Sequence, residues 1–506
     1  MEMNCFQGKI TINNGRIKLL EKDRNNLEII TENNKYSFEN AYAYPGFTDS
    51  HGHVLALGKQ LNGINLSVMN SAEECVSEAK KHVTMKGNWL IGSGWNHELW
   101  FSQVLPEAKI IDDAFPDIPV CFKRIDGHSI WVNSKAMEIA DINVLTKDPR
   151  GGEIIRMKTG EPTGILIDNA MNFVLKHIPK PNRDEIKFDI VTALNTLVEA
   201  GLTEVHDMDV NPKYLEIYQE LDNNNELPIR VNAFVRAQNN EWMNLGIRPE
   251  RFKNFRISGI KIFYDGAIGS RGAALLEPYS DAPETRGLLM LDFDQSYEIC
   301  RKGLENGFHI AAHAIGDAAV RLALDVYEKL RKNGIAKKDS VLRIEHSQHI
   351  HPTDIKRFTK NDIIAAVQPM QAISDIPMAE KRLGWERCKY SYLWKTLSNF
   401  GVVIAGGSDF PIETHKPLSG MAAFSQRKDK RNGKKWFPEE ILSRDEAIEA
   451  YAKNCHLAAG IKSRATIKEN FDADLTILDK NLLTCPEEKI ENTKVLAVFV
   501  GGDKVF

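Results

Sequence analysis

The amino-acid sequence predicts an α/β fold: a (β/α)8 (TIM) barrel with a large insertion after its first strand, and a small β-sandwich domain built from both termini. Three observations predict it: eight short apolar runs alternate with helical spacers, both ends are rich in strand formers, and one gap is far longer than the others. A parallel strand pair needs a crossover, usually a helix, and eight such units close a barrel. At 506 residues the chain exceeds the roughly 250 residues that a barrel needs.

The eight runs are short and rich in β-branched residues, each has a polar residue at or near its end, and helical stretches follow most of them. They are AYPGFTDSH (43–51), LTEVHDMD (202–209), PIRVNAFVR (228–236), RISGIKIFYDG (256–266), FHIAAHAIGD (308–317), VLRIEHSQH (341–349), IIAAVQPM (363–370) and VVIAGGSDF (402–410). A closing helix is expected from the capping-box pair Ser443 and Glu446 to a stop at Gly460.

Both ends of the chain have the pattern of strands. The first 40 residues contain GKITI and IKLL on either side of a hairpin signal, Asn13-Asn14-Gly15, and the last contain ADLTILD (473–479) and VLAVFVGGDKVF (495–506). We therefore expect residues 1–44 and 462–506 to form one composite small β domain, and residues 45–461 to form the barrel.

The first run ends at residue 51 and the second begins at residue 202. This gap predicts an insertion over about 62–190, with strands and helices of its own. An insertion after the first barrel strand lies beside the mouth where barrel active sites form, so we interpret it as a cap that contributes to specificity.

Charge and cysteine content exclude several classes of protein. The net charge is −4 with both signs spread along the chain, which does not suit nucleic-acid binding. The seven cysteines are scattered without a CxxC pair, which is typical of reduced thiols in the cytosol. The amino terminus lacks a signal-peptide pattern, and no apolar run has the length of a membrane span. We expect a cytoplasmic protein with a small-molecule substrate and no nucleic-acid or membrane partner.

Histidines and one aspartate collect at the ends of the predicted strands. His51 and His53 form an HxH pair on one strand face, and His313, His346 and Asp409 end later runs. A single histidine at a strand end is more often structural. Four of them with an aspartate at the same barrel edge indicate a site for Zn²⁺ or a neighbouring divalent metal.

Lys261 stands inside the apolar run ISGIKIF. Burial of an ammonium is costly, so this lysine is expected to lose its proton or to be modified. A neutral lysine can take up CO₂ as a carbamate, whose two oxygens could bridge two metal ions. The alternative is an ion pair with a carboxylate such as Asp265.

Together these segments resemble the amidohydrolase superfamily, in its YtcJ-like branch (amidohydrolase family 3), which includes N-substituted formamide deformylases. The resemblance covers nearly the whole chain. It rests on PGFTDSHGH (45–53), GSGWNHELW (92–100), RIDGHSIWVNSKAM (124–137), GEPTGILIDNA (160–170), KIFYDGAIGSRGAALLEPYSD (261–281), HAIGD (313–317), RIEHSQHI (343–350), VQP (367–369) and GSDFPIE (407–413).

The resemblance implies a metal set of His51, His53, Lys261, His313, His346 and Asp409, and a β domain split between the two ends. It also allows a homodimer, because dimers are common in the superfamily. The chain departs from the branch at Asn96, where an aspartate is usual, and at Gly272, where a threonine is usual. Both positions leave the identity of the substrate open.

Five further residues are candidates for substrate binding. Trp95, Asp126 and His128 belong to the insertion, where the alternative is a cap core with satisfied polar groups. Asp265 and Arg271 follow the fourth strand directly, where the alternative is a salt bridge within the loop. For His206 and His309, packing in the core is favoured.

The predicted reaction is attack of a metal-bound hydroxide on an amide-like, non-peptide C–N bond in a small molecule, with one or two ions, most simply zinc. Asp409 would take the water proton and later give it to the leaving nitrogen, with Lys261 and His346 as further catalytic residues. The alternatives are hydrolysis of an ester, lactone or cyclic amide, and a non-enzymatic regulatory protein on the same scaffold. No GxSxG elbow, Walker loop or GxGxxG motif supports another chemistry.

Overall fold

The computed structural model describes residues 4–23, 26–81, 85–86, 88–125, 127–429, 431–462 and 466–506. The chain divides into two compact units: Met1–Val54 with Leu194–Phe506, and Leu55–Ala193. The first unit contains the barrel, both chain ends and all of the predicted metal ligands. The second spans the range in which the sequence predicted an insertion, and its action as a cap stays a prediction.

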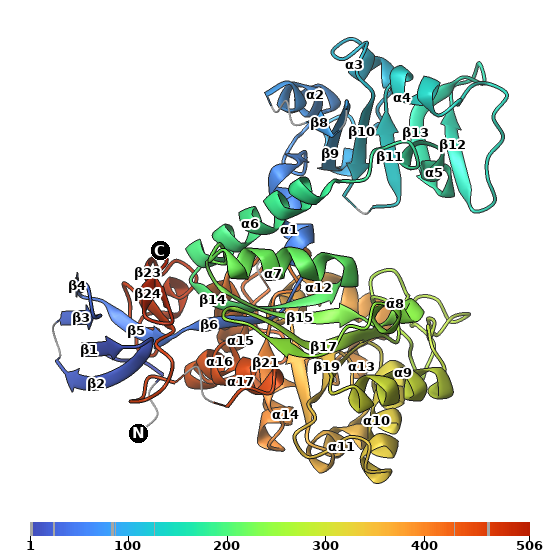
Figure 1. The fold of residues 1–506 in the computed structure, drawn as a ribbon. Helices are drawn as coiled ribbons and strands as arrows, with labels where there is room; N and C mark the ends of the chain where they lie inside the picture. The colour runs from blue at the N-terminus through green and yellow to red at the C-terminus, as the bar shows by residue number, and fades with distance from the viewer. Residues whose placement is uncertain are drawn as a thin grey trace. The chain divides into compact units, whose positions relative to one another are not determined.

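Parallel strands of the first unit form the barrel in the order β6-β14-β15-β17-β18-β19-β20-β21. Each overlaps one of the eight runs of the sequence, so the α/β class and a nearly closed barrel are confirmed within the described chain (Figure 1). The strands are β6 (Phe47–Gly52), β14 (Leu202–Val210), β15 (Arg230–Arg236), β17 (Phe255–Phe263), β18 (His309–Ala314), β19 (Leu342–His346), β20 (Ile363–Val367) and β21 (Ile404–Gly406). A short β16 (Glu250–Arg251) pairs antiparallel with β17.

The segment after β21 returns to the first strand and closes the barrel. The backbone N–H of Asp409 donates to the carbonyl of His51 at 2.7 Å, and that of His53 donates to the carbonyl of Phe410 at 2.9 Å. Gly52 and Phe410 form a parallel bridge between these hydrogen bonds. The closure therefore brings the HxH pair and the aspartate together by backbone contacts alone.

Helices surround the strands on the outside of the barrel (Figure 1). In α10, the buried residues Val320, Ala323, Leu324 and Tyr327 recur at helical spacing, which gives one apolar face to pack on the strands. The helices are α7 (Leu215–Asn223), α8 (Glu241–Asn244), α9 (Phe293–Glu305), α10 (Asp317–Lys332), α11 (Ile355–Lys360), α12 (Pro369–Leu383), α13 (Trp385–Cys388), α14 (Trp394–Asn399), α15 (Pro417–Gln426), α16 (Arg444–Ala450) and α17 (Lys453–Ala458).

The predicted closing helix is present but broken into α16 and α17. Its capping box forms as expected, with Ser443 and Glu446 each accepting from the other's backbone N–H. The break lies at Ala452, whose φ of −132° and ψ of −100° are not helical. The carbonyl of the preceding Tyr451 accepts a hydrogen bond from Thr48 N on β6 at 2.7 Å, so the backbone leaves the helix to bind the first barrel strand.

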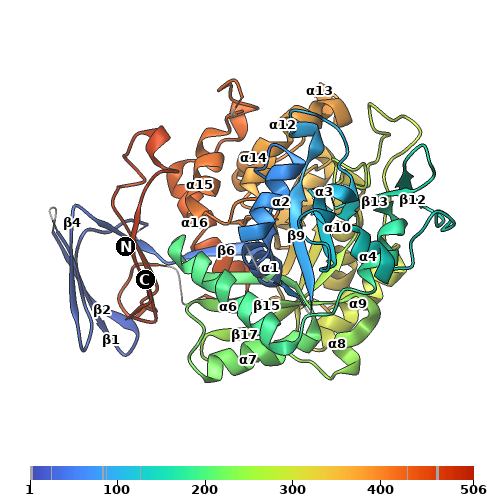
Figure 2. The same cartoon turned by 90° about the horizontal axis from the view of Figure 1, so that it is seen from above.

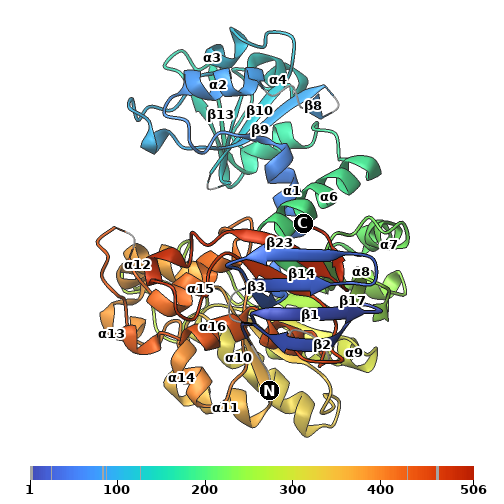
Figure 3. The same cartoon turned by 90° about the vertical axis from the view of Figure 1, so that its left-hand side faces the viewer.

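The two chain ends form two sheets, in the orders β2-β1-β3-β4 and β24-β23-β22-β5. Buried residues alternate along β1, and its Ile10 and Ile12 share one apolar cluster with Leu475 and Phe499 from the other end. Figures 2 and 3 show these blue and red strands side by side. The strands are β1 (Gly8–Asn13), β2 (Arg16–Lys22), β3 (Asn26–Ile30), β4 (Lys35–Glu39), β5 (Tyr42–Pro45), β22 (Leu475–Leu478), β23 (Val495–Val500) and β24 (Asp503–Lys504).

The second unit has a sheet in the order β12-β13-β11-β10-β9-β7, with β8 paired to β9. Trp95, Trp100 and Trp131 are buried in one of its apolar clusters. Its elements are β7 (Ile64–Asn65), α2 (Ala72–Lys81), β8 (Met85–Lys86), β9 (Trp89–Trp95), α3 (Ala108–Asp112), β10 (Val120–Arg124), β11 (Ser129–Val132), α4 (Ser134–Ile139), β12 (Gly152–Arg156), β13 (Pro162–Asp168) and α5 (Asn172–Leu175). The helices α1 (Val54–Asn62) and α6 (Arg183–Glu199) span the two points in the sequence at which one unit passes into the other.

All seven cysteines are free thiols. Within the described ranges, no helix combines the length and the apolar character needed to cross a membrane.

Candidate metal centre

The six residues predicted as metal ligands lie at the carboxyl-terminal ends of the barrel strands. Because these ends share one face of a parallel barrel, residues far apart in the sequence meet there. His51, Lys261, His313 and His346 belong to β6, β17, β18 and β19, and His53 and Asp409 follow β6 and β21.

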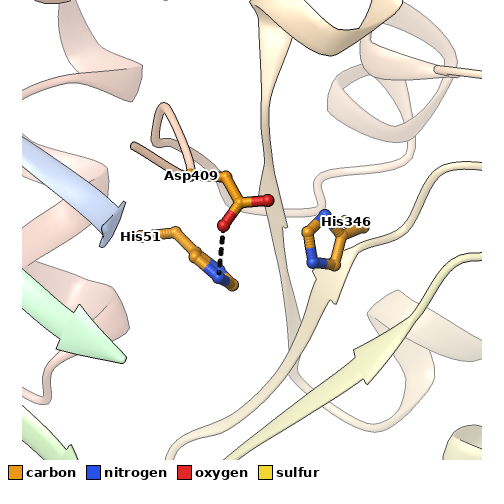
Figure 4. A group of neighbouring side chains, drawn as sticks. All are labelled: His51, His346 and Asp409. Carbon is orange, nitrogen blue, oxygen red and sulfur yellow. Dashed lines mark ion pairs between the residues drawn. The ribbon is translucent and has the colours of Figure 1, made fainter. Parts of the chain in front are cut away.

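Three of these side chains form one compact group: His51, His346 and Asp409. Each offers one ligand atom, these atoms lie within 4.8 Å of one another, and all three residues are buried. Figure 4 shows the carboxylate of Asp409 between the two imidazoles. Asp409 Oδ1 lies 3.5 Å from His51 Nε2. Two imidazoles and a carboxylate are a donor set that suits Zn²⁺ and its neighbours, so this group could hold a metal ion.

Hydrogen bonds fix which ring nitrogen of each HxH histidine faces Asp409. His51 Nδ1 lies 2.6 Å from Glu345 Oε2 and His53 Nδ1 lies 3.0 Å from the carbonyl of Met208. Both oxygens accept, so both Nδ1 atoms carry hydrogen and each neutral ring turns its Nε2 lone pair inward. The Nε2 atom of His51 lies 3.5 Å from Asp409 Oδ1, and that of His53 lies 3.1 Å from it. These acceptor atoms converge on one point, which is an arrangement that a cation satisfies.

Without a metal ion, a proton on His53 satisfies part of this arrangement. Burial lowers the pKa of His53, but the hydrogen bond and charge of Asp409 outweigh burial and raise that pKa above its ordinary value. Burial alone would raise the pKa of Asp409, but His53 and the neighbouring histidines hold it well below its ordinary value. Burial and the charge of Lys261 keep the pKa of His51 well below its ordinary value. The site thus holds an anionic carboxylate and a neutral His51, the forms that bind metal.

His313 and His346 lie next to each other, with ring centroids 4.4 Å apart. Burial lowers the pKa of both imidazoles, so both are neutral near pH 7. His313 Nε2 is buried, lies 3.5 Å from Asp265 Oδ1, and makes no hydrogen bond to any described residue. A buried ring nitrogen without a hydrogen bond is suited to bind a metal ion.

Lys261 is fully buried, with Nζ 3.4 Å from His51 Nε2 and 4.8 Å from the centroid of the Phe263 ring. Burial lowers the pKa of its amine to about 8. The alternative pairing with Asp265 is not seen in the described chain. The carboxylate of Asp265 instead accepts from three backbone N–H groups, those of Ala274, Ile315 and Gly316.

The backbone turns His346 toward the site. Arg343 and Glu345 are two apart on β19 and both are buried in the barrel, so strand alternation alone would place His346 on the opposite face. His346 instead has a φ of 70°, in the left-handed region, and Asp409 has a φ of 61°. Such conformations are unfavourable for residues other than glycine and are concentrated at functional sites.

Sequence reasoning missed two groups that contact the predicted ligands. Glu345 accepts from His51, and Arg343 in turn donates to Glu345 and to the carbonyl of Ser50. The opposite charges two residues apart in a buried strand were a signal that could have identified this pair. Gln371, on α12, contacts both Asp409 and His346. The only feature of the sequence that could have pointed to Gln371 is its position just after the VQP motif.

The guanidinium of Arg271 forms an ion pair with another side chain of the described chain. It donates to Asp281 at 3.2 and 2.9 Å, and Asp281 also binds Arg382. A role of Arg271 and Asp265 in substrate binding stays a prediction.

The predicted substrate residues of the second unit lie in different settings. Trp95 has no exposed surface, and its indole N–H donates to the carbonyl of Phe122 at 2.8 Å. His128 is exposed and lies 2.9 Å from Asp168. Asp126 is outside the described residues. Contact of any of these with substrate stays a prediction.

Comparison with known proteins agrees with this geometry. The model of the amidohydrolase family matches residues 38–506. The chain is 34% identical over 490 residues to a putative amidohydrolase, YtcJ, of Bacillus subtilis (strain 168), covering 94% of this chain and 91% of that protein. It is 24% identical over 479 residues to an N-substituted formamide deformylase of Arthrobacter pascens, covering 90% and 87%.

A solved structure of an uncharacterized metal-dependent hydrolase from Pyrococcus furiosus is also similar, with a TM-score of 0.77 and 26% identity. The match covers 95% of this chain and 99% of that one. These likenesses support a metal-dependent hydrolase.

Proposed function

Because the chain belongs to the amidohydrolase family, we propose that it hydrolyses an amide-like, non-peptide C–N bond in a small molecule, using one or two divalent metal ions, most simply zinc. The observation that carries the proposal is the convergence of the Nε2 lone pairs of His51 and His53 on Asp409 Oδ1, with His346 beside them. The name of the A. pascens relative favours an amide, and a formamide in particular.

The proposed ligands are His51, His53, Lys261, His313, His346 and Asp409, all at one end of the barrel. A divalent ion held there would lower the pKa of water and polarise the substrate's carbonyl oxygen. Lys261 would join as a carbamate. Its amine has a pKa lowered to about 8, so a fraction is neutral at pH 7 and can attack CO₂. The nitrogen lone pair forms an N–C bond as one C=O π bond of CO₂ breaks, one amine proton leaves to solvent, and the carbamate so formed would offer the two oxygens of CO₂ as ligands.

Asp409 is the proposed proton carrier. Its carboxylate is ionised and buried at the mouth, and it accepts a proton from the water that attacks the carbonyl carbon. The tetrahedral intermediate then collapses, and Asp409 gives this proton to the leaving nitrogen. An ester or lactone needs less help at this last step, because an alkoxide leaves more readily than an amide anion. The same site could therefore also act on those bonds.

The test begins with metal content per chain, measured on protein purified without chelator, on Lys261→Ala, and on Lys213→Ala as a control. Lys213 pairs with Glu241 at the surface. We expect one to two equivalents of metal in the wild type and the control, and less in Lys261→Ala. Unchanged metal in Lys261→Ala would favour one ion without a carbamate.

A panel of formamides, cyclic amides and lactones then tests the bond. Turnover of a linear formamide above the others supports the proposal, and turnover of lactones or cyclic amides alone would assign the alternative chemistry. A wild-type protein that takes up no metal, even after reconstitution with bicarbonate, would contradict the proposed function.

A further inference from the structure

One glutamine side chain contacts two of the proposed active residues at once. Gln371 Nε2 donates to Asp409 Oδ2 at 2.8 Å, and Gln371 Oε1 lies 3.3 Å from His346 Nδ1. Asp409 comes from the segment after β21 and His346 from the end of β19, so the amide joins two separate strand ends. None of the eight apolar runs predicts this contact, because Gln371 lies on α12, just beyond the run that ends at residue 370.

The chemistry of the amide fixes the orientation of all three groups. A carboxylate oxygen accepts, so the NH₂ of Gln371 must face Asp409 and its carbonyl oxygen must face His346. That oxygen can only accept, so His346 Nδ1 carries the hydrogen. The Nε2 of a neutral His346 is then left with its lone pair free for a ligand. The same contact occupies Asp409 Oδ2 and leaves Oδ1 for the two HxH histidines.

The backbone of Gln371 is held independently of any ligand. Pro369 lies at the start of α12, where its ring fixes the backbone, and Met370, Ala372 and Ile373 around Gln371 are buried. By contrast, His346 and Asp409 both leave their strands with φ in the left-handed region, so strand alternation does not orient their side chains. Of the three, Gln371 is therefore the member that can orient the other two.

We propose that Gln371 is a positioning residue, which fixes His346 as the tautomer that binds metal through Nε2 and holds Asp409 in the orientation needed for proton transfer. The proposal rests on the proposed function for the role of Asp409, whereas the effect on His346 concerns metal binding alone. A histidine that binds metal through one ring nitrogen generally donates a hydrogen bond from the other. Loss of the group that accepts this hydrogen bond typically costs about 10- to 100-fold in metal affinity or activity.

The test compares two substitutions that separate the two halves of the contact. Gln371→Met has nearly the same length and loses both hydrogen bonds. Gln371→Glu keeps an acceptor for His346 but places a second carboxylate against Asp409. The matched control is Gln426→Met on α15, because Gln426 donates to the carbonyl of Glu487 and touches none of the proposed ligands. The protein used is the full chain, which is stripped of metal by a chelator for the binding and melting measurements and reconstituted with zinc for the kinetic ones.

Four quantities are measured on each protein. They are the zinc affinity of the metal-free chain, by competition with a chromophoric chelator, the melting temperature without metal, and kcat and KM on the best substrate of the panel. In Gln371→Met we expect zinc affinity and kcat each to fall by about tenfold or more, with KM within about twofold. In Gln371→Glu we expect zinc affinity to be kept and kcat to fall. The control and the metal-free melting temperatures should match the wild type.

Gln371→Met with the zinc affinity and kcat of the control would overturn the proposal. So would equal losses in both substitutions accompanied by lower metal-free melting temperatures, because that pattern indicates loss of structure. If the wild type binds zinc but cleaves no amide, the proposed function fails while a weakened zinc affinity in Gln371→Met still supports the tautomer assignment. If the wild type binds zinc and cleaves the amide, and Gln371→Met does both equally well, only the role of Gln371 is contradicted.

Discussion

His51 Nδ1 and Glu345 Oε2 lie 2.6 Å apart, and both side chains are almost completely buried. The carboxylate is held in turn by the guanidinium of Arg343, which also donates to the carbonyls of Ser50 and Ala458. The ring of His51 is thus oriented by a chain of charges anchored in the barrel wall. Hydrogen bonding by a carboxylate also makes the free Nε2 a better metal ligand.

Glu345→Gln should weaken both metal binding and stability. The amide oxygen can still accept from His51, but it carries no charge, so metal affinity is expected to fall by about tenfold. Arg343 is left as an uncompensated buried cation, and breaking such a pair costs about 3–5 kcal/mol. Metal content after dialysis and urea denaturation measure the two effects. Glu305→Gln, at an exposed ion pair with Arg301, is the control. A Glu345→Gln protein with the metal content of that control would show that Glu345 does not support His51.

Asp409→Asn separates metal binding from catalysis. Asparagine keeps an oxygen near His51 and His53 but cannot carry the proton, so we expect turnover to fall by a factor on the order of 10²–10⁴. Much of the metal should stay bound through the histidines. Metal content and kcat are measured on the same preparation. Near-normal turnover with normal metal content would exclude Asp409 as the proton carrier.

The stability of the barrel should fall at acidic pH because of His206. This residue is fully buried, and its Nδ1 lies 3.0 Å from Arg343 Nη1, which can only donate, so the ring is held neutral. Burial lowers the pKa of His206 to about 4. In the unfolded chain the ordinary value is about 6.5, so between these values the unfolded state binds more protons. The contribution of the neutral His206 to the free energy of unfolding is fully present above pH 6.5 and is lost as the pH falls toward 4.

His206→Asn tests this pH dependence, because the asparagine oxygen can accept from Arg343 and cannot be protonated. At pH 5 the wild type should lose about 2 kcal/mol through His206 relative to pH 7.5, and the variant should lose that much less. The free energy of unfolding in urea at the two pH values gives the comparison, with pH 7.5 as the internal reference. Equal losses in the two proteins would mean that His206 is not held neutral in the folded state.

The sequence was sufficient to predict the barrel and the family, and both are confirmed. The strands were predictable because short β-branched runs before helices have few other solutions. It was also sufficient to place His51, His53 and Asp409 at one edge, because strand ends meet there. It could not predict the turn of His346 toward them, since this depends on a left-handed backbone at a residue that is not glycine.

Gln371 and the break at Ala452 were unpredictable for a related reason. Each follows from a contact between segments far apart in sequence: Gln371 with Asp409, and the carbonyl of Tyr451 with Thr48. Local pattern gives the helix that carries Gln371 and the capping box before the break, but it contains no information on the partner. Residues that orient a site from a neighbouring element are therefore the part that a single sequence does not reveal.

Removal of metal should destabilise only the first unit. Every proposed ligand belongs to Met1–Val54 or Leu194–Phe506, and none belongs to Leu55–Ala193. A ligand that binds only the folded state stabilises it by about 4 kcal/mol when its free concentration is 1,000 times Kd. A chelator should therefore lower the melting temperature, and added zinc should restore it. Hydrogen exchange should rise at the ends of β6 and β19 and over residues 407–411, where loss of the ion leaves lone pairs facing a carboxylate. Amides of β9 to β13 in the second unit serve as the control within the same sample. An equal rise in exchange in both units would place the bound metal outside the barrel mouth.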